Sequence, residues 1–536
     1  MKKLLYIIAL TGLLWSCTED HGNYDYLPSN KITITGFNGE LVPEVMYVQL
    51  QKDDSIKLKP DVIFDKEDES DALKFEWYSG GELISEEDSL AYPVKELKEY
   101  REGTNLKPFI KLVATNTSSG DIDMLGCYAE VEPPRGWVVL TKQSGGEHQL
   151  SYFYNDWASD NSSLTLEADV NVYERVNPGE TLGSDVVKIR SHYTAGPQST
   201  DNILVVKSEY PYTIDVNGET FAKNVNTMKL FAGGNVPENY SPIDECATTL
   251  APYSAAYIIN QDGSIYSRFK NTPTEHLSGV YTPEPYYVDA KGARVTRIWP
   301  SVDGFFCAWM YDDLNKRLLI GTSGIGNANG VAAFPADPSK YGDESLGFPK
   351  FYDLQGEILY IGETEPSDRT AVMVYHSDTE GYKLIRVYMY LSQYQNTFSV
   401  SFMRDHEVHL LDETLINGDS RFLQPRKNKE VFFFTGGTGN QTLYMYEYGT
   451  GRGIVEYESF DSPIASIATD INKDGNSTIN NVIAVGLKSG ELKIINIHPD
   501  VVSNDALKGE RELASYDLGD EIVNVIYKYG FMYNAW

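Results

Sequence analysis

Cysteine, positive charge and long apolar runs are all scarce in this sequence. The chain has 536 residues and four cysteines, and no two of the cysteines stand in the CxxC spacing typical of thiolate metal sites. Lys and Arg total 45 against 77 Asp and Glu, a net charge of −32, which argues against nucleic-acid binding because a phosphate backbone requires a basic surface. Beyond the N-terminal segment no second long apolar run predicts a membrane-spanning helix.

The N-terminal segment has the pattern of an export signal. Two lysines precede the apolar stretch Leu4 to Trp15, which is too short to span a bilayer as a helix. The run Leu14-Trp15-Ser16-Cys17 resembles a bacterial lipoprotein lipobox. The resemblance implies that residues 1–16 are a signal peptide and that Cys17 carries the lipid, since two or three acyl chains anchor a soluble domain stably. An ordinary secretory signal with an unlipidated cysteine is the alternative.

The residues after Cys17 bear on which side of the membrane the protein faces. Thr18-Glu19-Asp20 resembles the export signal of Bacteroidota surface lipoproteins. The resemblance implies a protein in the outer membrane, lipid-anchored and facing the cell exterior. The alternative is a solvated acidic tether, because short acidic runs occur in any solvated segment. Residues 17–30 have the glycine, asparagine, proline and serine of a flexible tether in either case.

Residues 31–132 show short alternating strands separated by turn residues. The segments are KITITGF, VMYVQL, SIKLKP, KFEWYSG, FIKLVATNT and CYAEVEP, and the last two predict a closing hairpin. Trp77 lies where an immunoglobulin-like sandwich places a core tryptophan, so we expect it in the core. The stretch resembles a PKD-like domain. Pro133-Pro134-Arg135-Gly136 then forms a stiff boundary.

Residues 136–536 repeat one unit, an apolar strand, a polar turn and a second strand rich in Tyr, Phe or Ile. The repeat predicts hairpins that begin about 50 to 65 residues apart, at Trp137, Asn202, Ala255, Arg317, Thr370, Glu430 and Asn481. This spacing leaves room for four strands and their loops, as in a β-propeller blade. A lone strand, Glu521 to Tyr529, is suited to complete the first blade and close the ring. We therefore expect an all-β protein, an immunoglobulin/PKD-like β-sandwich followed by a β-propeller of seven blades, with six or eight as alternatives.

The whole layout resembles the PKD-like lipoproteins of Bacteroidota. The lipobox, the PKD-like stretch and the propeller entry strand Gly136-Trp137-Val138-Val139-Leu140 carry this resemblance. It implies an accessory surface lipoprotein of a SusC/SusD-type system, which imports oligopeptides or glycans through a TonB-dependent transporter. The resemblance implies no catalytic residues.

Two motifs partly match metal-binding patterns. RDHEVHL, with His406 and His409, falls one residue short of HExxH, and on a strand the two histidines point to opposite faces. Asp470, Asn472 and Asp474, followed by Gly475, match the first half of a calcium loop, but Asn481 stands where the bidentate Glu belongs. A structural Ca²⁺ is therefore weighed against a polar hairpin turn, which is the favoured interpretation. We expect no required cofactor.

Two tryptophans are candidate stacking platforms for a ligand. Trp157 and Trp299 lie in expected loops, and packing between blades is the alternative for each. The sequence thus predicts a non-catalytic surface protein that binds an oligopeptide or a glycan, or that acts as scaffold for the transporter. The alternative is a propeller-based hydrolase or lyase acting on extracellular peptide or polysaccharide, because propeller enzymes take catalytic residues from loops without short motifs.

Overall fold

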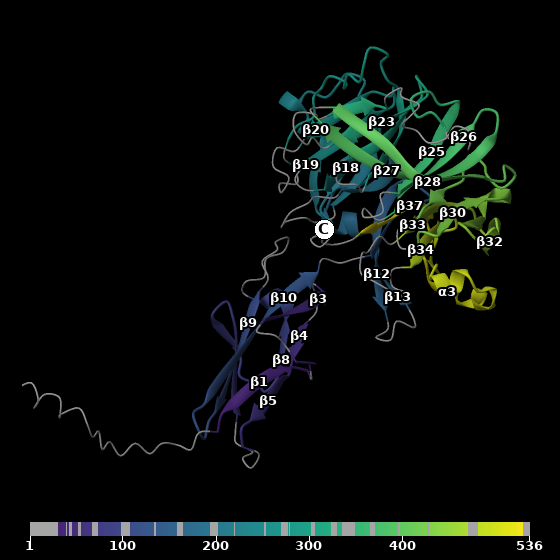
Figure 1. Ribbon diagram of the computed structural model, residues 1–536. Coiled ribbons are helices and arrows are strands. Elements are labelled where there is room, and N and C mark those ends of the chain that lie inside the picture. Colours follow the sequence, from purple (N-terminus) through teal and green to yellow (C-terminus); the bar gives the residue numbers. More distant parts are fainter. Residues whose placement is uncertain are drawn as a thin grey trace, which may run out of the picture. The chain divides into compact units, whose positions relative to one another are not determined.

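The computed structural model folds almost entirely into β-strands, which divide between two compact units (Figure 1). Unit 1 comprises Met1–Glu102 and Leu106–Val131, and unit 2 comprises Gly103–Asn105 and Glu132–Trp536. The structure describes residues 30–38, 40–41, 45–51, 55–66, 73–97, 108–132, 136–157, 164–192, 202–218, 220–250, 253–269, 277, 279–301, 306–322, 330–334, 349–364, 370–394, 397–425, 428–469 and 481–528. No helix within these ranges has the length and apolar character needed to cross a membrane.

Unit 1 consists of three small sheets. Its strands are β1 (Ile32–Phe37), β2 (Glu40–Leu41), β3 (Val45–Gln51), β4 (Ser55–Leu58), β5 (Pro60–Phe64), β6 (Leu73–Ser79), β7 (Glu82–Ser85), β8 (Leu90–Pro93), β9 (Phe109–Asn116) and β10 (Ile122–Glu132), with the 3₁₀ helix η1 (Val94–Glu96). The sheet orders are β2-β1-β5, β3-β10-β9-β6-β7 and β4-β8. The predicted hairpin of β9 and β10 is confirmed as an antiparallel pair.

One hydrophobic cluster joins the three sheets of unit 1. Phe37, Leu58 and Trp77 come from different sheets, and all three side chains are buried in this cluster. The Trp77 indole nitrogen donates a hydrogen bond of 3.0 Å to the Glu87 carbonyl. Trp77 is therefore a core residue, as its place in the strand pattern predicted.

Unit 2 is a succession of antiparallel meanders. The first sheet is β37 (Glu521–Lys528), β11 (Gly136–Lys142), β12 (His148–Trp157) and β13 (Leu164–Asp169), followed by α2 (Val172–Val176). Next come β14 (Val186–His192), β15 (Asn202–Lys207), β16 (Ile214–Val216) and β17 (Lys223–Asn226), then η2 (Thr227–Leu230), η3 (Ala232–Gly234), β18 (Pro242–Leu250), β19 (Tyr253–Asn260) and β20 (Ile265–Phe269). These seven strands form one sheet, in which a single parallel pair, His192 with Ala247, joins β14 to β18.

Four-stranded sheets make up the rest of unit 2. The first consists of β21 (Val295–Pro300), β22 (Phe306–Asp312), β23 (Arg317–Thr322) and β24 (Gly330–Ala333). The second consists of β25 (Gly356–Glu363), β26 (Thr370–Ser377), β27 (Gly381–Tyr394) and β28 (Thr397–Leu410). The next is β29 (Phe422–Leu423), β30 (Val431–Gly436), β31 (Thr442–Glu447) and β32 (Ile454–Ser459), with η6 (Thr438–Asn440). The last is β33 (Ile464–Thr469), β34 (Val482–Leu487), β35 (Glu491–Asn496) and β36 (Glu512–Asp517), with α3 (Pro499–Val502) and η8 (Asp505–Glu510).

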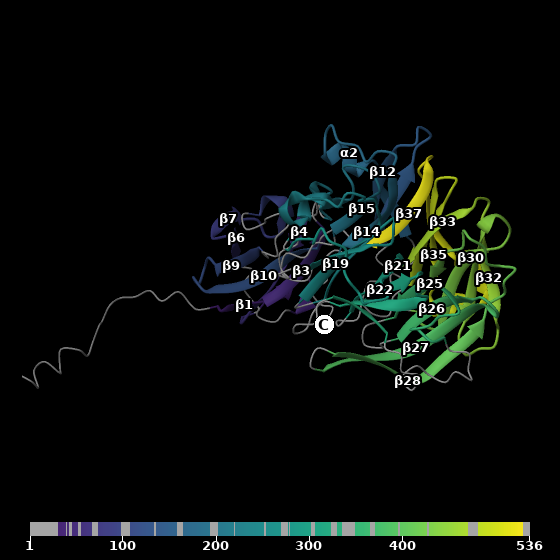
Figure 2. The same ribbon diagram turned by 90° about the horizontal axis from the view of Figure 1, so that it is seen from above.

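All seven predicted hairpins are antiparallel pairs in the structure: β11–β12, β15–β16, β19–β20, β23–β24, β26–β27, β30–β31 and β34–β35. The predicted C-terminal strand, β37, pairs with β11 from Gly136 opposite Lys528 to Lys142 opposite Glu521. In Figure 2 the yellow β37 lies among blue strands from the beginning of the unit. The closure predicted from the sequence is therefore confirmed.

The meanders pack face to face around a closed circle. Each sheet shares a buried hydrophobic cluster with the next, and the last sheet shares one with the first, through Val139 and Phe153 against Ala484 and Ile494. Strands β15, β30 and β34 are buried at every position because neighbouring meanders cover both faces. Figure 2 shows the sheets following one another in colour order around the unit. This arrangement is that of a β-propeller.

Candidate functional site

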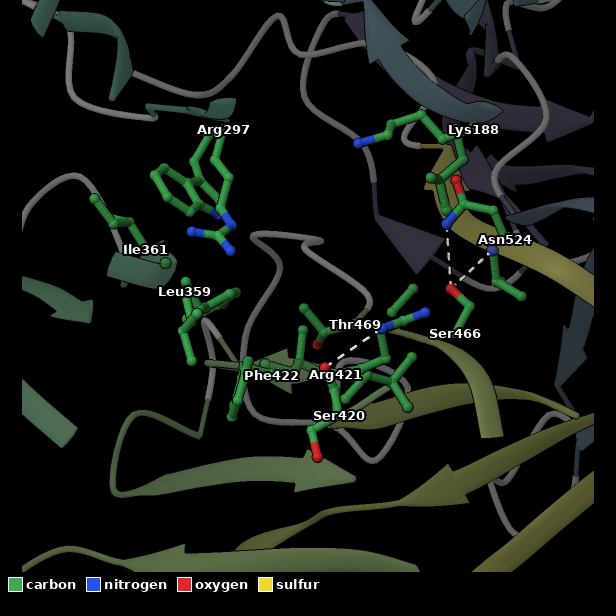
Figure 3. A pocket seen from close by; sticks show the side chains of 18 of the residues that line it. Lys188, Arg297, Leu359, Ile361, Ser420, Arg421, Phe422, Ser466, Thr469 and Asn524 are labelled. Atoms are coloured by element: carbon green, nitrogen blue, oxygen red, sulfur yellow. Dashed lines mark hydrogen bonds between the residues drawn. The ribbon is translucent and has the colours of Figure 1, made fainter. Parts of the chain in front are cut away.

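A cavity of about 780 Å³ opens where the first strands of the meanders converge. It is lined from β14, β21, β25, β29, β33 and β37, with further residues from the segment before β29. These strands contribute consecutive residues, apolar and polar together, among them residues 187–191 of β14 and 359–363 of β25. Figure 3 shows the cavity from close by, with charged side chains from several strands around one open space.

Side-chain hydrogen bonds tie neighbouring strands together around this cavity. Asn524 on β37 accepts a hydrogen bond of 2.9 Å from the Ile189 amide on β14 and donates one of 3.2 Å to Ser466 on β33. The Gln424 amide, just after β29, donates to the Tyr360 hydroxyl on β25 at 2.9 Å. These bonds hold the wall of the cavity in a fixed geometry, which a preorganised binding site requires.

Strand β14 places two cations at the cavity. Lys188 and Arg190 stand two residues apart and so share a face of the strand. Both bind the buried carboxylate of Asp244 on β18, Lys188 at 2.9 Å and Arg190 through Nε at 3.0 Å and Nη2 at 2.7 Å. Burial disfavours the Asp244 carboxylate, but the two cations outweigh it and lower its pKa. Two positive charges thus share one negative charge.

Two further arginines reach the cavity with different partners. Arg297 on β21 donates to the Glu357 carboxylate at 2.9 Å and to the Ile358 carbonyl at 3.1 Å. Among the described residues Arg421, directly before β29, donates only to main-chain oxygens, those of Ala465, Asp419 and Ser420 at 3.0, 2.9 and 3.4 Å. The charge of Arg297 is therefore compensated by a carboxylate, whereas that of Arg421 meets carbonyl dipoles alone.

Aromatic and acidic groups complete the lining. Trp299, Tyr360 and Phe422 contribute apolar surface. Glu363 on β25 accepts hydrogen bonds from the Ser301 hydroxyl at 2.8 Å and from the Trp309 indole at 2.5 Å. The described residues that line the cavity include no histidine and no cysteine. The arrangement offers hydrogen-bond donors, positive charge and stacking surface, which are the means of binding a polar ligand.

A second polar cluster lies buried in the seven-stranded sheet. His192 and Asp215 are each about 1% exposed and are joined by a 2.7 Å contact between Nδ1 and Oδ2. Nearby, the Tyr281 hydroxyl donates to Glu245 at 2.8 Å, and the Arg268 guanidinium lies 5.3 Å from the centre of the Tyr281 ring. Burial raises the pKa of Glu245 to about 7, and the Tyr281 hydrogen bond offsets part of that effect. Its burial makes this cluster part of the fold and keeps it away from a substrate in solution.

The structure places one of the predicted stacking residues at the cavity. Trp299 is 9% exposed, lines the cavity and packs in the cluster between two sheets. Its role as a stacking platform for a ligand stays a prediction. Trp157 was expected in a loop, but it ends strand β12, opposite Leu164, and its side chain is outside the described residues. The loop assignment of Trp299 was also wrong, because it lies in β21 opposite Trp309.

The other predicted residues fall elsewhere or outside the described ranges. Cys17, Asp470, Asn472 and Asp474 lie outside the described residues. His406 and His409 belong to strand β28, and His409 contacts Glu407 at 3.0 Å and the Tyr446 hydroxyl at 2.7 Å. Within the described ranges no three His, Cys, Asp or Glu side chains gather as metal ligands would.

The charged lining was not identified from the sequence. The run VVKIRSH of β14 carries Lys188 and Arg190 in alternation within an apolar strand, and this was the available signal. Arg421 gave no such signal, because the strand it precedes has only two residues. Its position depends on the convergence of strands that are distant in sequence.

Comparison with known proteins gives fold likeness alone. The chain matches no protein-family model and no curated protein. Among solved structures it resembles a quinonprotein alcohol dehydrogenase-like protein from Bacteroides thetaiotaomicron, with 10% identity, a TM-score of 0.33 and coverage of 93% of this chain and 98% of that one. It also resembles dihydro-heme d1 dehydrogenase NirN in complex with DHE, with 7% identity, a TM-score of 0.36 and coverage of 77% of this chain and 72% of that one. A third similar structure is BamB from Moraxella catarrhalis, with 11% identity, a TM-score of 0.30 and coverage of 74% of this chain and 92% of that one. Likenesses this low carry no argument about function.

Proposed function

We propose that the protein is a non-catalytic binding protein whose cavity receives an oligopeptide or a glycan. One observation carries the proposal: the first strands of the meanders enclose a cavity of about 780 Å³, a volume within the usual range for ligand sites. Its hydrogen-bonded wall, charged side chains and aromatic surfaces suit a polar ligand better than a lipid. The protein is proposed to bind its ligand without chemical conversion.

The proposal includes the finer architecture. The seven-stranded sheet is counted as two blades, because a single residue pair joins its halves, and this count gives seven blades. Unit 1 is proposed to be a PKD-like sandwich that acts as a spacer, since its sheets share one core. A ring of face-packed sheets presents a broad, rigid surface to a ligand or partner.

The proposed place of action is the outer surface of the outer membrane. The lipobox at Cys17 and the acidic residues after it support lipid anchoring and surface exposure. The layout of the chain supports a SusC/SusD-type transporter as the partner. Sequence resemblance supports both the location and the partner, and an experiment on membranes tests them directly.

A pull-down from native outer membranes tests the partner. The full chain would be recovered in mild detergent and its companions identified by mass spectrometry, with the Cys17→Ser variant as control. Stoichiometric recovery of a SusC/SusD-type pair with the native chain, and its loss with Cys17→Ser, is the expected result. Recovery of the native chain alone would contradict the transporter partnership.

Binding without turnover is tested on the purified full chain. Oligopeptides and oligosaccharides would be screened by calorimetry, and each binder would then be incubated and analysed by mass spectrometry. We expect binding with no change in the mass of the binder. Release of shorter products or of an unsaturated sugar would establish the hydrolase or lyase alternative instead.

A further inference from the structure

We propose that the cavity recognises its ligand through a carboxylate group, which Arg421 and the Lys188–Arg190 pair bind. This inference rests on the proposed binding function and adds the chemical class of the ligand. It derives from the balance of charges among the side chains that line the cavity. The chain as a whole carries a net charge of −32, so uncompensated positive charge at one cavity is a specific feature.

Arg421 carries an uncompensated charge. Its Nε and Nη1 atoms donate to main-chain carbonyl oxygens of Ala465, Asp419 and Ser420, and these bonds fix the guanidinium plane. Among the residues that the structure describes, none provides an acceptor for Nη2 and none pairs a carboxylate with Arg421. Because Nε and Nη1 are engaged in this way, Nη2 remains to donate to a carboxylate oxygen.

The β14 pair supplies a second excess of positive charge. Asp244 is the carboxylate that both Lys188 and Arg190 bind, so three charged groups sum to one positive charge. About one third of the Lys188 side chain and one quarter of that of Arg190 remain exposed. Asp244 therefore positions the two cations and leaves them able to bind a further anion.

The lining that comes from β21 and β25 has no such excess. Arg297 pairs with Glu357 on β25, which leaves that pair neutral. Glu363 on the same strand accepts hydrogen bonds from Ser301 and Trp309. Figure 3 shows Lys188, Arg297 and Arg421 directed toward the same open space. A bound carboxylate is thus attracted by Lys188, Arg190 and Arg421, the cations of the lining whose charge is not fully balanced among the described residues.

Two kinds of ligand present this group. An oligopeptide has an α-carboxylate at its C-terminus, and an acidic glycan has carboxylates on its uronic acid units. Either carboxylate has two oxygens that accept hydrogen bonds from positively charged donors. The carboxylate is common to both kinds of ligand, and binding measurements distinguish the peptide from the glycan.

Calorimetry on the purified full chain with four probes tests the assignment. The probes are penta-alanine, penta-alanine amide, trigalacturonate and the methyl ester of trigalacturonate. Within at least one pair, we expect the acid to bind at least tenfold more tightly than its neutral form, because hydrogen bonds between charged partners are the stronger ones. The pair that shows the difference identifies the source of the carboxylate.

Variants locate the effect. Arg421→Gln and Lys188→Gln should each weaken binding of the preferred acid about tenfold or more and leave the neutral form unchanged. Arg452→Gln is the matched control, because Arg452 is a partly exposed arginine outside the cavity, paired with Glu447 and Asp505. If Arg421→Gln unfolds the protein, Lys188→Gln still tests the carboxylate assignment. This variant is expected to fold, because Arg190 continues to bind the buried Asp244.

Each contrary outcome has a separate meaning. Equal binding of an acid and its neutral form would overturn the carboxylate assignment and leave the proposed binding function in place. Selective binding of acids that neither cavity variant weakens would place the carboxylate site elsewhere and overturn the assignment too. Failure of all four probes to bind would count against the proposed function and, with it, against this inference.

Discussion

At the scale of single residues, the cluster around Glu245 brings several polar side chains together in a buried position. Several of its atoms have no hydrogen-bond partner within the described part of the chain, among them Glu245 Oε2, Tyr240 Oη and Arg268 Nε. Buried polar atoms of this kind are commonly satisfied by internal water. Glu245 also faces the charges of Arg268 and Asp215, so its protonation state matters for stability.

The first prediction concerns the pH dependence that Glu245 confers. Its pKa rises from 4.5 to about 7 on folding, so the folded state holds a proton that the unfolded state releases. The corresponding stability is fully present below about pH 4.5 and is lost as pH rises through 7. Glu245→Gln should remove this loss, so that the variant gains stability relative to the native chain between pH 5 and 8, measured as Tm.

Glu180→Gln is the control for that measurement. The Lys223 ammonium lowers the pKa of Glu180, so the stability it contributes is present at high pH and is lost as pH falls through the lowered pKa. This variant should therefore show no gain over the native chain between pH 5 and 8. A Glu245→Gln variant whose Tm runs parallel to that of the native chain across this range would contradict the assigned role.

At the scale of elements, the sequence predicted the middle strands of the meanders and missed most of the first strands. Middle strands such as β30 and β34 are covered on both faces, so they read as continuous apolar runs. First strands such as β14 and β25 line the cavity and mix polar with apolar residues. The candidate site is built from these first strands. A pattern search for apolar hairpins therefore finds the fold and passes over the site.

Closure of the ring depends on β37, and a single buried side chain tests it. Ile522 is fully buried between the first and last sheets of unit 2. Ile522→Ala should reduce the free energy of unfolding by about 2–5 kcal/mol, because it removes apolar contacts and leaves a cavity. Denaturant unfolding followed by tryptophan fluorescence measures the change.

The exposed Leu410 at the end of β28 provides the comparison for Ile522. Its side chain is 69% exposed, so Leu410→Ala should change stability by no more than about 0.5 kcal/mol. Equal effects of the two substitutions would show that β37 does not secure the ring. The contrast isolates burial, since both substitutions remove a branched aliphatic side chain.

At the scale of the whole molecule, the sequence predicted two domains from a change of pattern and from the Pro133-Pro134 boundary. The hydrophobic cluster of Trp77 belongs wholly to unit 1, and that of Trp137 belongs wholly to unit 2. Separate cores should unfold in separate transitions, since each unit loses its own buried surface cooperatively. What sequence patterns do not supply is the position of each charge around a shared cavity, because that depends on strands far apart in the chain.

The last prediction uses one tryptophan from each core. Trp77→Ala should lower one calorimetric transition and Trp137→Ala the other, each by about 3–5 kcal/mol in stability, because both side chains are fully buried. Trp137 also packs edge-on against Tyr527 of the closing strand, with ring centres 4.7 Å apart, so its loss weakens the closure as well. If both substitutions shift a single shared transition, the two cores unfold as one cooperative unit, and unit 1 contributes to the stability of unit 2.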